Sequence, residues 1–318
     1  GLNAVNKNRI EIAVTDANPN IVYLVASSAG THVLEAFYKS SNKGASFSQR
    51  INGATFNILG GEINGTETRG QGWYDLSIVS IPSDSNFVLV GGINIFKSVN
   101  GGTSWTPSAS WKSQGGTDYV HADIHFLGRN PLNNEIWVGS DGGVDFTTNN
   151  GTTYTSRNNG LTIGQIYNLG VSQRSKTRFI SGFQDDGTKV GSTPTNWIAR
   201  VGGDGMHCEI SNFDTTVLFG NVQYGDLQRS TNNGATFTDI TVPGAPGPWA
   251  APCHLHPRRN DIMVVLYKDA RVSFDIVSGA TPAFSNITTG ETNDGSAIRF
   301  SNVNDSLVFL GWENGLFR

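Results

Sequence analysis

The sequence predicts an all-β fold built from repeated four-stranded sheets, and three observations support this prediction. The chain of 318 residues holds 39 Gly beside abundant Asn, Ser and Thr, which favours tight turns between short strands. No convincing long helical period of apolar residues is found. A pattern of eight residues also recurs four times, so the chain is a set of similar repeats.

The recurring pattern, here called the box, reads hydroxyl-x-Asn-x-Gly-x-hydroxyl-aromatic. The four copies are Ser40-x-Asn42-x-Gly44-x-Ser46-Phe47, Ser98-x-Asn100-x-Gly102-x-Ser104-Trp105, Thr147-x-Asn149-x-Gly151-x-Thr153-Tyr154 and Ser230-x-Asn232-x-Gly234-x-Thr236-Phe237. Asn folds its amide onto the following backbone, Gly takes a positive φ and the hydroxyls bond turn amides, which predicts a hairpin turn with an aromatic ring packed beneath it.

The spacing of the boxes predicts the architecture. Their starts lie 58, 49 and 83 residues apart, which indicates a unit of roughly 40 to 50 residues with two units in the last gap. That period is typical of β-propellers. We expect a single propeller over 1–318 with seven four-stranded blades, six or eight being the alternatives, and an incomplete last blade.

Residues 121–154 serve as the template for the units: strand, turn, strand, Asp-Gly-Gly turn, strand and box. The expected units in chain order are 9–50, 72–108, the template, 163–200, 203–241, 248–289 and 293–318. Residues 51–71 are predicted to be an insertion and 109–120 a link. The fourth and sixth units are expected to lack a box.

The box resembles the Asp-box of sialidases, sortilin-type receptors and two-domain xyloglucanases, with Asn in the four places where Asp is usual. The runs GQGWYDL, HADIH, GSDGGV, NNGL, GFQDDGT and GGDGM resemble large secreted Bacteroidetes proteins of the Asp-box, glycosyl-hydrolase-like kind. The resemblance implies a propeller, an extracellular or cell-surface location, type IX secretion and further domains, so we expect the chain to be part of a larger protein. It leaves the activity open, because such boxes occur in enzymes, receptors and adhesins alike.

Composition excludes several classes of partner. The net charge of −4 and the lack of a basic stripe argue against nucleic acid and against an anionic membrane. No run of 18 apolar residues is present, so no transmembrane segment is expected. Cys208 and Cys253 are expected to be two buried thiols rather than a disulfide, because they fall at matching positions of consecutive repeats.

In an up-and-down sheet of four strands, the boxes leave the opposite face free for ligands. Carboxylates and aromatic residues gather there although charge is scarce elsewhere. The candidate binding residues on that face are Trp73, Tyr74, Asp75, His121, Asp123, His125, Gln184, Asp185, Trp249, Trp312 and Glu313. The tryptophans are either sugar platforms or packing residues between sheets.

Three aspartates on that face, Asp141, Asp186 and Asp204, are candidate catalytic residues, because glycoside hydrolysis needs two carboxyl groups. The alternative is that each Asp shapes its own turn. His121, Asp123 and His125 alternate along one expected strand, so they are a candidate site for zinc or a similar metal, or an inter-sheet tether; calcium bound by Asp loops is the other possible cofactor. A sialidase is disfavoured because the arginines are scattered.

These observations leave three functions open. The first is a binding or adhesion propeller with glycan or protein as its ligand, without an activity of its own. The second is a glycoside hydrolase, similar to the xyloglucanases, that uses two of the aspartates to cleave a β-glucan-like polysaccharide. The third is a structural subunit of a surface assembly.

Overall fold

The computed structural model describes residues 6–161, 164–193, 195–240, 242–244, 246–288, 290–301, 303–312 and 315–317. The chain divides into two compact units, Gly1–Thr162 (unit 1) and Ile163–Arg318 (unit 2). Within the described ranges the strands form seven antiparallel sheets, six of four strands and a last one of three. The expected all-β fold and the count of seven blades with an incomplete last blade are therefore confirmed.

Unit 1 contains blades one to three, and in each blade every strand pairs with the next strand of the chain. Its strands are β1 (Lys7–Val14), β2 (Val22–Ser28), β3 (Leu34–Ser40), β4 (Ser48–Ile51), β5 (Ser77–Ile81), β6 (Asp84–Gly91), β7 (Ile95–Ser98), β8 (Thr106–Ala109), β9 (Ile124–Arg129), β10 (Ile136–Ser140), β11 (Gly143–Thr147) and β12 (Thr155–Ser156). One short 3₁₀ helix, η1 (Gln114–Gly116), lies in the link before β9.

Unit 2 contains blades four to seven with the same up-and-down order. Its strands are β13 (Ile166–Val171), β14 (Phe179–Phe183), β15 (Gly187–Thr193), β16 (Asn196–Val201), β17 (Cys208–Ile210), β18 (Leu218–Asn221), β19 (Leu227–Ser230), β20 (Thr238–Ile240), β21 (Cys253–Leu255), β22 (Met263–Leu266), β23 (Ala270–Ser273), β24 (Ser285–Asn286), β25 (Gly295–Phe300), β26 (Val308–Trp312) and β27 (Gly315–Phe317). A second short 3₁₀ helix, η2 (Gln223–Gly225), lies between β18 and β19.

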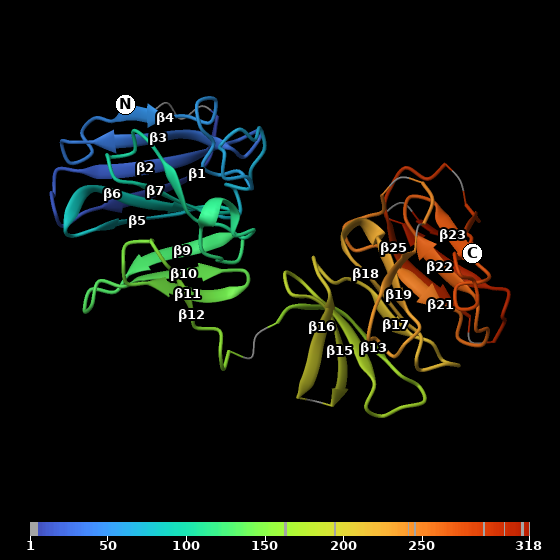
Figure 1. The fold of residues 1–318 in the computed structure, drawn as a ribbon. Coiled ribbons are helices and arrows are strands. Elements are labelled where there is room, and N and C mark those ends of the chain that lie inside the picture. The colour runs from blue at the N-terminus through green and yellow to red at the C-terminus, as the bar shows by residue number, and fades with distance from the viewer. Residues whose placement is uncertain are drawn as a thin grey trace. The chain divides into compact units, whose positions relative to one another are not determined.

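Successive blades within each unit pack face to face, and their first strands adjoin one another (Figure 1). Central strands are covered on both faces, so β2 is buried along almost its whole length. Between blades one and two, Phe37 packs against Trp105 with ring centroids 4.8 Å apart, and both rings are buried. Apolar burial between neighbouring sheets is thus the main stabilising contribution within each unit.

All four boxes form the same hydrogen-bonded turn between the third and fourth strands. In each, the Gly amide donates to the first hydroxyl at 2.9 to 3.0 Å, and the Asn Oδ1 accepts the amide four residues later at 2.9 to 3.0 Å. The Asn Nδ2 donates to the second hydroxyl at 2.7 to 2.8 Å. The side chains therefore close the turn as the pattern predicts.

The sixth blade lacks the eight-residue box, as expected, but it keeps part of the box contacts. Its β23–β24 turn keeps the hydroxyl and carboxylate pair, since Ser273 donates to Asp275 at 2.9 Å. Asp275 accepts the amide of Ala283, eight positions later instead of four, at 2.9 Å. The turn is longer, so its residues no longer match the spacing of the other four copies.

The expected alternation of His121, Asp123 and His125 on one strand is wrong. Strand β9 begins only at Ile124, and Asp123 has a left-handed backbone with φ of 64°. A register shift between Gly139 and Ser140 of β10 accompanies this start. The three side chains therefore do not share one face of a strand.

Both cysteines, Cys208 and Cys253, are buried free thiols, as the sequence predicts. Burial raises the pKa of each thiol above its usual value, which keeps both protonated and unreactive. Within the described ranges, no helix has the length and apolar character to cross a lipid bilayer.

Candidate functional site

The boxes mark one end of each sheet, so the turns between second and third strands and the links between blades emerge at the other end. In unit 1 this opposite end carries residues 71–76, 92–94, 110–123 and 140–143. In unit 2 it carries residues 184–186, 202–207, 222–226 and 246–252. Most of the predicted site residues lie in these segments.

Asp141 in the β10–β11 turn is held by two donors from unit 1. The hydroxyl of Tyr74 donates to Asp141 Oδ2 at 2.8 Å, and His125 Nε2 lies 2.6 Å from Oδ1. The ring of Tyr74 meets the ring of His125 edge-on, with centroids 4.7 Å apart. The structure thus brings together three residues that are 67 and 16 positions apart in the chain.

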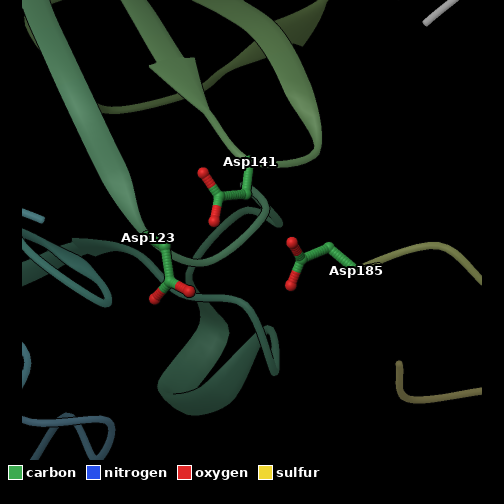
Figure 2. A group of neighbouring side chains, drawn as sticks. All are labelled: Asp123, Asp141 and Asp185. Carbon is green, nitrogen blue, oxygen red and sulfur yellow. The ribbon is translucent and has the colours of Figure 1, made fainter. Parts of the chain in front are cut away.

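Asp123 and Asp141 are neighbours, as Figure 2 shows, and an oxygen of one carboxyl group lies within 4.8 Å of an oxygen of the other. The side-chain amide of Gln71 donates to Asp123 Oδ1 at 2.8 Å. Burial and the nearby charge of Asp141 raise the pKa of Asp123. Gln71 is a site residue that sequence reasoning missed, although it lies in the GQGWYDL run.

Asp75, whose charge is affected by both of these carboxyl groups, is fully buried. Neither of its oxygens has a hydrogen-bond partner among the described residues. Burial first, and then the adjacent carboxylate of Asp123, raise the pKa of Asp75 to about 9. Asp75 was expected among the binding residues of the free face, and the structure places its side chain in the interior of unit 1 instead of at the surface.

A pocket of about 360 Å³ adjoins the aspartates and belongs wholly to unit 1. Its polar lining comes from Glu67, Arg69, Gln71 and Asp123, and Trp111 forms an aromatic side. The indole of Trp111 is 40% exposed. A pocket with one partly exposed indole and several charged groups suits a small polar ligand.

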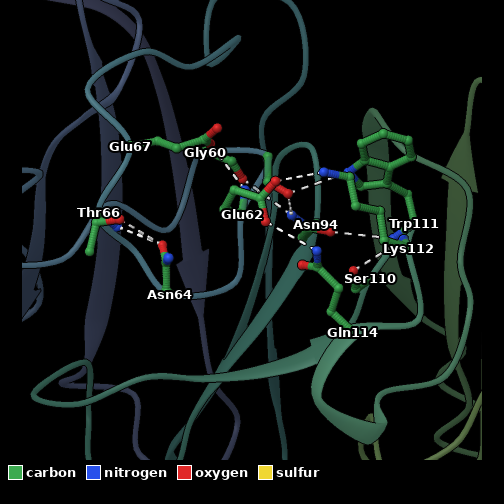
Figure 3. Close-up of polar contacts among 11 residues, drawn as sticks. Gly60, Glu62, Asn64, Thr66, Glu67, Asn94, Ser110, Trp111, Lys112 and Gln114 are labelled. Carbon is green, nitrogen blue, oxygen red and sulfur yellow. Dashed lines mark hydrogen bonds and ion pairs between the residues drawn. The ribbon is translucent and has the colours of Figure 1, made fainter.

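The insertion 51–71 forms one wall of the pocket and is fastened to the link 110–116 (Figure 3). Asn94 donates its side-chain amide to the carbonyls of Gly60 and Gly61 at 3.2 and 2.9 Å. Lys112 Nζ lies 2.6 Å from Glu62 Oε1 and 4.7 Å from the Trp111 ring centroid. These contacts hold the wall and the indole in place.

Unit 2 presents an aromatic group formed by Tyr167, Trp249 and Tyr224. The indole N–H of Trp249 donates to the hydroxyl of Tyr167 at 3.0 Å, which in turn donates to Gln184 Oε1 at 2.9 Å. Tyr224 meets Trp249 edge-on with centroids 5.4 Å apart. Each ring remains between 37% and 52% exposed.

Tyr224 has a left-handed backbone with φ of 63°, which is unfavourable for a bulky residue. The surrounding chain holds it there, since its N–H donates to the carbonyl of Trp249 at 3.1 Å and its carbonyl accepts from Gly247 at 2.8 Å. Strain of this kind persists only where the fold enforces it and is concentrated at functional sites.

The two candidate catalytic aspartates of unit 2 have different surroundings. Asp204 is buried and accepts the backbone N–H of Asp185 at 2.6 Å and the side-chain amide of Gln223, so it shapes its own loop. Asp186 is exposed and pairs with Lys189. Asp141 belongs to unit 1, so the expected convergence of these three carboxylates stays a prediction.

The tryptophans separate into exposed and buried residues. Trp312 is buried and its indole donates to the carbonyl of Lys268 at 2.8 Å, which makes it a packing residue and not a platform. Trp73 is 56% exposed and lies beside Tyr74 and His32. Glu313 lies outside the described residues. His121 lies before β9, with Nδ1 3.2 Å from the carbonyl of Ala122.

A histidine cluster that sequence reasoning missed lies on the inner strands of unit 2. His254 Nδ1 lies 2.5 Å from Glu209, and Arg299 donates to His254 Nε2 at 2.9 Å. Because a guanidinium only donates, the imidazole proton resides on Nδ1. Burial, followed by His254 and Arg299, lowers the pKa of the neighbouring His207 to about 4.

No family model matches the chain, and no curated protein matches it. Similar solved structures include a GH74 xyloglucanase from Xanthomonas campestris, 14% identical with a TM-score of 0.36 over 86% of this chain and 45% of that chain. A GH74 enzyme from Niastella koreensis is 18% identical with a TM-score of 0.34, over 86% and 46%. YCF48 from Cyanidioschyzon merolae is 14% identical with a TM-score of 0.30, over 81% and 76%. The chain spans less than half the length of the two GH74 enzymes, and likeness at this level concerns the fold alone.

Proposed function

We propose that this chain is a glycan-binding β-propeller of the Asp-box type that acts outside the cell or at its surface. It binds polysaccharide through the end of the blades opposite the boxes. The observation that carries this proposal is the aromatic group Tyr167, Trp249 and Tyr224, whose rings are exposed, hydrogen-bonded into position and, for Tyr224, held in a strained backbone. Sugar rings stack their apolar C–H faces on such rings, while nearby polar groups take their hydroxyls.

Affinity electrophoresis of the full chain in gels that contain β-glucan, xyloglucan, mannan or pectin tests this function. We expect at least one polysaccharide to retard the wild type, and Trp249→Ala to weaken that binding about fivefold, because a stacked ring contributes about 1 kcal/mol. Phe274→Ala is the matched control, since Phe274 is also an exposed aromatic but lies in the β23–β24 turn at the opposite end. Failure of every polysaccharide to retard the protein, or an equal loss in both variants, would contradict the proposal.

A second candidate function, glycoside hydrolysis, is favoured by the geometry of Asp123 and Asp141. Their nearest oxygens lie within 4.8 Å, and Asp123 lines the pocket. Retaining glycosidases place two carboxyl groups roughly 5 Å apart. On this account the wild type releases new reducing ends from a bound polysaccharide and Asp141→Asn does not. Binding without release by the wild type would leave only the first function.

A further inference from the structure

Asp75 presents the least satisfied polar group of unit 1. Its carboxyl group is 0% exposed, and neither oxygen has a hydrogen-bond donor within the described residues. A buried carboxylate without a donor or counter-charge is strongly unfavourable, since burial removes the hydration that stabilises its charge. The fold nevertheless keeps an acid at this position, between the GQGW turn and strand β5.

The carboxyl group of Asp123 lies close enough to Asp75 to act on its charge, and an oxygen of Asp141 lies within 4.8 Å of one of Asp123. Donors from other segments orient these two outer groups: Gln71 for Asp123, and Tyr74 with His125 for Asp141. Among the described residues, no such donor reaches Asp75. Two carboxylates cannot bond to each other directly, so either a proton or a cation must join Asp75 to Asp123.

We propose that a calcium ion binds between Asp75 and Asp123, with Asp141 as a neighbouring negative charge. The donors around this point are carboxylate oxygens, which suit a hard cation, and Asp75 can offer both of its oxygens. The Nε2 atom of His125 is engaged with Asp141, so that nitrogen is not free to bind the ion. Outer groups that orient the ligating carboxylates are typical of metal sites in proteins.

The pocket supplies the path by which the ion enters. Asp123 and Gln71 belong to its lining, and the pocket has room for water molecules that complete the coordination of the ion. The site goes beyond glycan binding and does not depend on it. It does bear on the hydrolase candidate, because an Asp123 that holds calcium is not free to exchange protons with a substrate.

The test is thermal unfolding of the full chain after treatment with EDTA and desalting, with and without millimolar CaCl₂ at constant ionic strength. We expect calcium to raise the Tm of the wild type by several degrees, since a ligand that binds only the folded state stabilises it. Asp75→Asn keeps the shape of the side chain but loses a charged ligand, so its Tm should not respond to calcium. Asp16→Asn, a change at an exposed aspartate in the β1–β2 turn, should keep the full response.

Isothermal titration of the same protein with CaCl₂ provides an independent measurement, with about one ion bound per chain expected. Should Asp75→Asn fail to fold, Asp123→Asn takes its place in both measurements. If calcium changes neither the Tm of the wild type nor the heat of titration, the proposal is overturned, and a shared proton joins Asp75 to Asp123 instead. An undiminished calcium response in both Asn variants would overturn it as well. The polysaccharide assay is separate, so either proposal can fail alone.

Discussion

His207 shows how burial controls the charge of a single side chain in unit 2. Its ring lies beside His254, with centroids 5.9 Å apart, and its Nδ1 is buried without a hydrogen-bond partner among the described residues. A second proton would be placed next to His254 and the guanidinium of Arg299. The folded chain therefore keeps His207 neutral at pH values where an unfolded chain would protonate it.

This arrangement predicts an acid-sensitive fold. The pKa of His207 is lowered from 6.5 to about 4, so between these values the unfolded state binds more protons and stability falls as pH falls. The loss amounts to as much as roughly 3 kcal/mol across that range. Urea unfolding of the wild type and of His207→Gln from pH 7 to pH 4.5 checks this: the variant should have the flatter profile. Parallel profiles would show that His207 does not contribute.

At the scale of single residues, the sequence indicated which side chains were candidates for binding but not how exposed each of them is. Trp249 lies in the link before β21 and is 42% exposed, whereas Trp312 ends β26, is buried and donates its indole N–H to the carbonyl of Lys268. Which of them is a platform depends on the packing of neighbouring loops. Local patterns do not contain that information, because burial is a property of the folded blade and not of the residue type.

At the scale of elements, the boxes were predictable because their chemistry is local. The side-chain hydrogen bonds that define a box turn join residues two or four positions apart, so spacing and residue type suffice to predict them. Blade six shows where this fails. Extra residues separate Asp275 from Ala283, and the same contact is then hidden from a search for a fixed spacing.

The glycine of a box can have a second role, which depends on the neighbouring blade. Gly44 and Gly102 share a φ of 85°, but a Cβ at Gly44 would meet nothing closer than 3.9 Å. A Cβ at Gly102 would lie 2.3 Å from the buried ring of Phe37 in blade one. The box turn of blade two is thus also a contact between blades.

These two positions form a matched pair for mutation. Gly44→Ala should destabilise by about 1 to 2 kcal/mol, since only the positive φ opposes an L side chain. Gly102→Ala should cost a further 1 to 3 kcal/mol, about the range for overpacking a core. Chemical denaturation of both variants measures the difference. Equal losses in the free energy of unfolding would mean that the Phe37 ring moves aside without destabilising the protein.

At the scale of the whole molecule, the number of blades followed from the sequence and the composition of the site did not. The repeat period predicts seven sheets because each repeat folds as one up-and-down unit. The site residues of unit 1 meet across far longer separations, such as Gln71 with Asp123 and Tyr74 with Asp141. Those pairings are set by the loops between blades, whose paths no periodicity describes.

The same limit explains the error at His121, Asp123 and His125. The alternating pattern predicted one strand face, but the left-handed turn at Asp123 delays β9 and sends its carboxyl group toward Gln71 and Asp141. A turn residue inside an apparent strand pattern cannot be recognised from alternation alone. The three residues were found by sequence, but the geometry that relates them was not.

Hydrogen exchange of the full chain, measured with and without a saturating bound polysaccharide, tests most directly where the ligand binds. The account predicts slower exchange at residues 222–226 and 246–250, next to the aromatic group, and unchanged exchange in the box turns at 41–46, 99–104, 148–153 and 231–236. Protection confined to the box turns would contradict it, because the ligand would then occupy the opposite ends of the blades.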